Sequence, residues 1–261
     1  MPGRHRKGPV SSGHRHGCTV RTPVPLPVEC PVSSPSVAQP VTFGGFSPDA
    51  VQFLASLAAN NDRAWFTPRK AEHERLLKRP MEALCVALDQ RFRERGLPLT
   101  ADPTRSPFRI HRDTRFSKDK SPYKTSAAAQ FPVAGGSGRP GGYLHIEPGD
   151  VMAGGGVHRP EQPVILAWRS LVATDPGAVH AAIDDPGFRA AFPDGLTGER
   201  LARVPAPYAK DHLDADLLRL KDMIFGTQLS DADIASPALP DLLCDLYAAA
   251  LPVFELLRRI V

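Results

Sequence analysis

The amino-acid sequence predicts an α+β domain that follows a basic, proline-rich tail. Apolar residues recur at helical spacing near both ends of the region from residue 43 to residue 261. Between these helical parts lie short runs of strand-forming residues, separated by glycine and proline. Because the strands are grouped and do not alternate with helices, we expect an antiparallel meander packed with an N-terminal helical hairpin and C-terminal helices.

Residues 1–42 are rich in proline, serine and glycine and have no sustained apolar period. Such a segment buries too little apolar surface to offset the conformational entropy lost on ordering. We therefore expect a disordered tail before a single domain at residues 43–261. Its weak patterning favours upstream sequence from a misassigned start over a segment that binds an acidic surface. Its five cations, opposed by Glu29 alone, are Arg4, Arg6, Lys7, Arg15 and Arg21.

The helical hairpin is expected between residues 47 and 96. Ser47–Pro48 and Thr67–Pro68 each combine a helix-capping residue with a first-turn proline. Asn60–Asn61 end the first helix, and Gly96 ends the second. Pro80 must kink or restart the second helix, because proline has no N–H to donate.

The sheet and the C-terminal helices are expected after the hairpin. The strand candidates are Phe108–Arg112, Ala127–Val133, Tyr143–Glu147 and Asp150–Ala153. The later runs with helical spacing are Val164–Val172, Leu213–Ile224 and Leu242–Phe254.

Charge, hydropathy and cysteine spacing exclude several classes of protein. The tail accounts for the whole net charge of +4, which leaves 27 basic and 27 acidic residues beyond it, so general nucleic-acid binding is not favoured. No apolar run reaches the roughly 18 residues of a membrane span, so we expect a cytoplasmic protein without membrane partners. Neither a disulfide framework nor a zinc knuckle is expected, because no paired spacing links Cys18, Cys30, Cys85 and Cys244.

One cationic segment, Arg105–Lys124, stands out from this neutral background. It contains seven cations against Asp113 and Asp119, a local net charge of +5. Serine, threonine and tyrosine hydroxyls lie within and beside it, as recognition of phosphate or carboxylate requires. We therefore expect a site for a phosphate-bearing or otherwise anionic ligand, with the candidate residues Arg112, Arg115, Lys118, Lys120 and Lys124.

A structural interpretation of the cationic segment stays open beside the binding interpretation. The stretch Asp211–Asp245 holds eight aspartates against Arg219 and Lys221. The two stretches could neutralise each other, which would make the protein a structural or interaction protein with internally paired charges.

Several blocks resemble a known family. They are Asn60–Phe66, the run RIHRDTRFSKDKSPYKT at Arg109–Thr125, the run YLHIE at Tyr143–Glu147, and Gly154–Gly156. In order and spacing they resemble the signature of domain-of-unknown-function family 2461, over about Phe43–Val261. His111 stands where that signature leads us to expect tyrosine. The resemblance implies that the cationic segment is a family feature, and it implies no activity.

His145 and Glu147 are the candidate catalytic residues of an alternative, hydrolase-type function. They share one face of a strand, where they could act as acid and base beside the cations. His111 and His158 could join them around a metal, but satisfied sheet histidines are the better interpretation, and we expect no metal and no cofactor. The sequence has no GxSxG elbow and no GxxxxGK[ST] phosphate loop.

Overall fold

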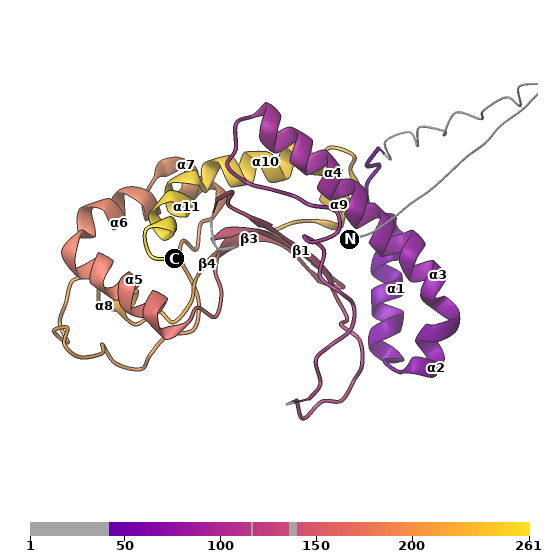
Figure 1. The fold of residues 1–261 in the computed structure, drawn as a ribbon, viewed down its shortest axis with the longest axis horizontal. Helices are drawn as coiled ribbons and strands as arrows, with labels where there is room; N and C mark the ends of the chain where they lie inside the picture. Colours follow the sequence, from indigo (N-terminus) through magenta and orange to yellow (C-terminus); the bar gives the residue numbers. More distant parts are fainter. Residues whose placement is uncertain (1–41, 116, 136–139) are drawn as a thin grey trace, which may run out of the picture. The chain divides into compact units, whose positions relative to one another are not determined.

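The computed structural model describes residues 42–115, 117–135 and 140–261, all within one compact unit, Pro40–Val261. The tail expected at residues 1–42 lies outside the described residues, apart from Thr42. A four-stranded antiparallel sheet packs with helices from both ends of the unit (Figure 1). The predicted α+β class is therefore confirmed.

The sheet has the strand order β1-β2-β3-β4. Strands β1 (Ala127–Pro132), β2 (Gly141–Glu147) and β3 (Asp150–Val157) form the expected meander. Strand β4 (Met223–Gln228) pairs with β3 after a long helical excursion.

Strand β4 was not predicted, because the run Leu213–Ile224 has apolar residues at helical spacing. In the structure only α8 (Ala215–Leu218) is helical there, and β4 begins at Met223. Pairing with β3 decides the conformation of this segment, and that partner lies about 70 residues earlier in the chain.

The two faces of the sheet differ in burial. Strand β2 alternates strictly, with Leu144 and Ile146 fully buried and Tyr143, His145 and Glu147 partly exposed. Helices α10 (Leu239–Ala249) and α11 (Leu251–Arg258) contact β3. The partly exposed face carries Tyr143, His145 and Glu147.

The N-terminal hairpin begins with α1 (Pro48–Ala59) and returns through an almost continuous helical run. That run consists of α2 (Arg63–Phe66), the 3₁₀ turn η1 (Thr67–Arg69), α3 (Lys70–His73), the π-helical turn η2 (Glu74–Lys78) and α4 (Arg79–Glu94). The irregularity expected at Pro80 is this π turn directly before it. The π turn is wider than an α-helical turn, so it accommodates the Pro80 ring, which would otherwise clash with the carbonyl four residues earlier.

The remaining helices are α5 (Gln162–Thr174), α6 (Pro176–Ile183), α7 (Pro186–Ala191) and α9 (Asp231–Ala235). The single helix expected at Leu242–Phe254 is two helices, α10 and α11, which meet at Ala250 just before Pro252. Across the described ranges, no helix has both the length and the apolarity needed to cross a bilayer.

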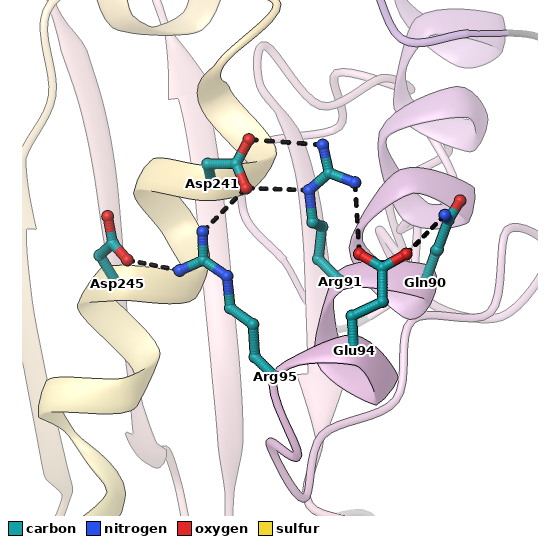
Figure 2. A network of polar contacts seen from close by, with 6 residues as sticks. All are labelled: Gln90, Arg91, Glu94, Arg95, Asp241 and Asp245. Atoms are coloured by element: carbon teal, nitrogen blue, oxygen red, sulfur yellow. Dashed lines mark hydrogen bonds and ion pairs between the residues drawn. The ribbon is translucent and has the colours of Figure 1, made fainter.

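Helices α4 and α10 are joined by a network of ion pairs (Figure 2). Asp241 Oδ1 accepts from Arg91 Nε and from Arg95 Nη2, both at 2.8 Å. Arg95 Nη1 also donates to Asp245 Oδ1 at 2.5 Å. Arg91 lies on the last turn of α4 and Arg95 is its C-cap residue, four positions on, while the aspartates are four residues apart on α10, so each pair lies on one side of its helix.

Candidate functional site

The cationic segment supplies residues of both arms of a hairpin that leads into β1 (Figure 1). Phe108 N donates to Ala128 O at 2.8 Å, and Lys124 N donates to Ile110 O at 2.8 Å. Isolated bridges join Pro107 with Ala129 and His111 with Tyr123. A regular strand at Phe108–Arg112 was expected, but only these bridges form, because the prolines at 107 and 122 have no N–H for a continuous ladder.

Asn61 anchors the hairpin to the turn after α1. Its Nδ2 donates to Tyr123 O at 2.9 Å, and its Oδ1 accepts from Tyr123 N at 3.1 Å. The ring of Tyr123 packs on Phe66, with 4.2 Å between the ring centroids. Two of the blocks singled out in the sequence therefore contact each other directly.

The five candidate cations are not gathered in one place. Arg112 is paired with Asp119, and Arg115 Nη2 lies 2.7 Å from Asp113 Oδ2. Lys120 Nζ donates to Thr114 O at 2.9 Å. Lys118 is exposed and lines none of the three pockets considered below.

Arg112 and Lys124 line one shallow pocket of about 390 Å³, which we call the lysine pocket. Hydroxyl groups surround the two cations, from Ser121, Thr125 and Ser126. Asn61 and Tyr123 complete the wall together with Ala58, and Asp119 contributes a carboxylate. The pocket thus combines a guanidinium, an ammonium and hydroxyls, which are the donors that bind oxyanions.

The two cations of the lysine pocket differ in how they are compensated. The Ser121 hydroxyl and the Arg112 guanidinium both bind Asp119 and lower the pKa of its carboxyl well below the usual range. Lys124 instead lies over the ring of Phe108, with Nζ 4.9 Å from the centroid. Partial burial, together with nearby Arg109, lowers the pKa of Lys124. Within the described ranges no carboxylate pairs with Lys124.

A deeper cavity of about 510 Å³ lies over the partly exposed face of the sheet, and we call it the sheet cavity. Phe108, Met152 and Ile224 provide apolar walls, and glycines of β2 and β3 form part of the floor. The polar residues in its lining are Gln130, Tyr143, His145, Asp150 and His158. An apolar cavity with a few convergent polar groups is typical of a small-molecule site.

A chain of hydrogen bonds connects the hairpin with the sheet cavity. Thr125 Oγ1 donates to Glu147 Oε1 at 2.6 Å. Glu147 Oε2 lies 3.2 Å from His145 Nε2, and His145 Nδ1 lies 3.1 Å from the Tyr143 hydroxyl. The structure therefore places the candidate pair His145 and Glu147 in contact, next to the cationic hairpin.

The other histidines named from the sequence do not gather around His145. His158 lines the sheet cavity but lies 3.5 Å from Asp222, whereas His111 packs on Tyr123 and lines a separate pocket beside His73. Among the residues that the structure describes, no group of three or more histidine, cysteine, aspartate or glutamate side chains could hold a metal ion.

Gly154–Gly156 are strand residues and are paired on both sides. They face β2 and β4, so their backbone groups serve the sheet ladder and not an anion. A Cβ at Gly154 would come 2.1 Å from Phe225 O, which explains the requirement for glycine by close strand packing.

Among the described residues, the ion pair of Arg112 is with Asp119 and not with the acidic stretch Asp211–Asp245. Asp214 binds His180, while Asp222 accepts from the backbone N–H groups of Arg159 and Glu199. Asp241 and Asp245 bind α4. The described charge pairs of the cationic hairpin are local to the hairpin itself.

Two contributors to the site were not recognised from the sequence as functional residues. Tyr143 follows the same period of two as His145 and Glu147, so the alternation of β2 was a sufficient signal for it. Phe108, which separates the sheet cavity from Lys124, gives no such signal, because its position depends on the fold of the hairpin.

Comparison with known proteins identifies a family. A family model described as a conserved hypothetical protein (DUF2461) matches residues 49–255. No curated protein and no solved structure matches the sequence.

Proposed function

The chain belongs to the conserved hypothetical protein family DUF2461, and we propose that it is a binding module for a phosphate-bearing or otherwise anionic ligand. The ligand occupies the lysine pocket, held by Lys124 and Arg112 with the hydroxyls of Ser121, Thr125 and Ser126. The proposal narrows the five candidate cations to the two that share a pocket.

The environment of Lys124 carries this proposal. A partly buried ammonium beside Arg109, without a carboxylate among the described residues, is unfavourable in the ligand-free protein. A bound anion would supply the missing counter-charge and raise the pKa of Lys124. Arg112 differs, because Asp119 already balances its charge.

The test is the thermal stability of the full chain with inorganic phosphate, pyrophosphate, nucleotides and sugar phosphates, at constant ionic strength. A ligand that binds the native state raises the melting temperature as its concentration exceeds Kd. We expect a rise with at least one phosphate-bearing compound. Lys124→Met should abolish it, since methionine keeps an apolar stem on the Phe108 ring and removes the charge.

Lys118→Met is the matched control. It removes one charge from the same hairpin at an exposed position outside the pockets. Loss of the shift in both variants would show non-specific attraction to the net charge of the hairpin. If none of these anions raised the melting temperature, the hairpin would have a structural role, in agreement with the alternative of a protein whose charges pair internally.

A second candidate function is a hydrolase-type enzyme, supported by the contact of His145 with Glu147 at the sheet cavity. An imidazole oriented by a carboxylate is a common acid–base arrangement. Burial raises the pKa of Cys85 to about 12 and that of Cys244 to about 11, so these two thiols stay protonated and are poor nucleophiles. Hydrolysis of p-nitrophenyl phosphate that is lost in His145→Gln and retained in Lys118→Met would support this function.

A further inference from the structure

The hydrogen bonds from Thr125 to Tyr143 have one consistent direction. The Glu147 carboxylate accepts at Oε1 from the Thr125 hydroxyl, so at Oε2 it accepts the Nε2–H of His145. A neutral imidazole with its proton on Nε2 has a free lone pair on Nδ1. The Tyr143 hydroxyl therefore donates its proton to Nδ1.

We propose that Tyr143 is a nucleophile that His145 activates as a general base, and that its target is a phosphate ester whose apolar group occupies the sheet cavity. His145 removes the phenol proton, while Glu147 and Thr125 position the imidazole. This inference rests on the second candidate function, the enzyme, and does not depend on anion binding in the lysine pocket.

The arrangement resembles a hydroxyl–imidazole–carboxylate triad built on one strand. Tyr143, His145 and Glu147 lie at every second position of β2 and so share a face. Packing restrains the Tyr143 ring, which stacks at 29° against the His145 ring and lies 6.1 Å from the Phe108 ring. The contacts match the general requirement for such a triad: the base, His145, touches the nucleophile, Tyr143, and a third group, Glu147, orients the base.

Burial supports the need for a base. It raises the pKa of the Tyr143 phenol, and nearby Asp150 and Glu147 add to the effect. The phenol is therefore neutral at physiological pH and is a weak nucleophile unless its proton is removed during attack. His145 Nδ1 is hydrogen-bonded to that proton.

In the proposed step, Tyr143 Oη forms a bond to phosphorus as the bond from phosphorus to the leaving oxygen breaks. The phenol proton passes to His145 Nδ1 and then to the leaving oxygen, which departs as an alcohol. Water subsequently attacks phosphorus, and its two hydrogens end on Tyr143 Oη and on the released phosphate. Tyrosine is thus regenerated, and no oxidant or reductant is needed.

The surroundings indicate the ligand class. Phe108, Met152 and Ile224 offer an apolar surface for the group that the phosphate esterifies. The Lys124 ammonium lies over the Phe108 ring, which itself lines the cavity and packs near Tyr143, so its positive charge acts on the phosphoryl oxygens across that ring and not by direct contact.

The test is covalent labelling of the full chain with an alkyl fluorophosphonate, followed by peptide mass spectrometry. Attack by Tyr143 forms an oxygen–phosphorus bond, breaks the phosphorus–fluorine bond and releases fluoride and a proton. We expect the label on Tyr143. In His145→Gln the labelling rate should fall roughly 100-fold, the lower range for loss of a general base.

Tyr208 is the internal control, because it is partly exposed and no histidine is hydrogen-bonded to it in the part of the chain that the structure describes. Its labelling rate should not change in His145→Gln. Glu147→Gln should slow labelling of Tyr143 less than His145→Gln does. It should also alter the imidazole tautomer seen by ¹⁵N NMR, a change that loss of packing alone would not produce.

Three results would overturn the inference. They are labelling of Tyr208 without Tyr143, equal labelling of Tyr143 in wild type and His145→Gln, and an imidazole proton on Nδ1 in the wild type. Circular dichroism would verify that each variant is folded. The lysine pocket is tested separately by Lys124→Met in the thermal experiment, so failure of one proposal is distinguishable from failure of the other.

Discussion

Replacing Asn61 with alanine should loosen the cationic hairpin and destabilise the domain. The substitution removes both hydrogen bonds to the backbone of Tyr123, whose side chain is 5% exposed. At about 1 kcal/mol for each bond, we expect a loss of about 2 kcal/mol in the free energy of unfolding. For a domain of this size that loss lowers the melting temperature by roughly 4–8 °C.

The assay is chemical denaturation combined with amide hydrogen exchange, which should show faster exchange at Tyr123. Asn60→Ala is the matched control, because the Asn60 side chain donates to Ser56 O within its own helix and does not contact the hairpin. If Asn61→Ala were as stable as Asn60→Ala and exchange at Tyr123 stayed slow, the packing of Tyr123 on Phe66 would hold the hairpin, and our reasoning about Asn61 would be refuted.

Two further predictions concern pH. Asp241→Asn should cost roughly 1 kcal/mol at low salt and less at high salt, because the pairs are solvent-accessible. Arg91 lowers the pKa of Asp241, so this stability is present above the ordinary carboxyl range and is lost as pH falls through the lowered pKa; denaturation at several pH values measures it. Asp184 and Asp214 raise the pKa of His180, so its contribution is complete below about pH 6.5 and is lost as pH rises through the raised pKa. His180→Gln should remove that dependence, and NMR titration of the imidazole would check the direction of the shift.

Local sequence signals were sufficient for most of the fold. The helix start at Pro48 and the alternation in Tyr143–Glu147 depend on signals that act within a few residues. The start expected at Thr67–Pro68 was wrong, because the helical run already begins at Arg63, where the Asp62 side chain accepts from Trp65 N, and Thr67 lies within that run. Strand β4 was missed because its conformation depends on pairing with β3, and its apolar residues also fit a helical period. The break between α10 and α11 had a local signal that the apolar stripe concealed: Pro252 has no N–H to donate, so the helix ends at Ala249 and a new one begins with Pro252 in its first turn.

The candidate site was only partly accessible to the same reasoning. Period two placed His145 and Glu147 on one face, and their contact follows from that. For the cations, residue type and charge identified the segment but did not predict which cation pairs with which carboxylate. The conformation of the hairpin decides which cation binds a carboxylate. In this conformation Arg112 binds Asp119, whereas the Lys124 ammonium lies over the Phe108 ring.

The same contacts join the cationic hairpin to the face of the sheet that carries His145 and Glu147. Asn61 holds the backbone of Tyr123, and two residues later Thr125 holds the carboxylate of Glu147. Lys124 lies between these two anchors, so its side chain is directed by contacts on both sides. A purely architectural hairpin would require the anchors and would gain from the ammonium only its contact with the Phe108 ring, whereas a ligand would also supply the counter-charge that its burial lacks. The position of Lys124 therefore argues for a ligand more strongly than the total charge of the hairpin does.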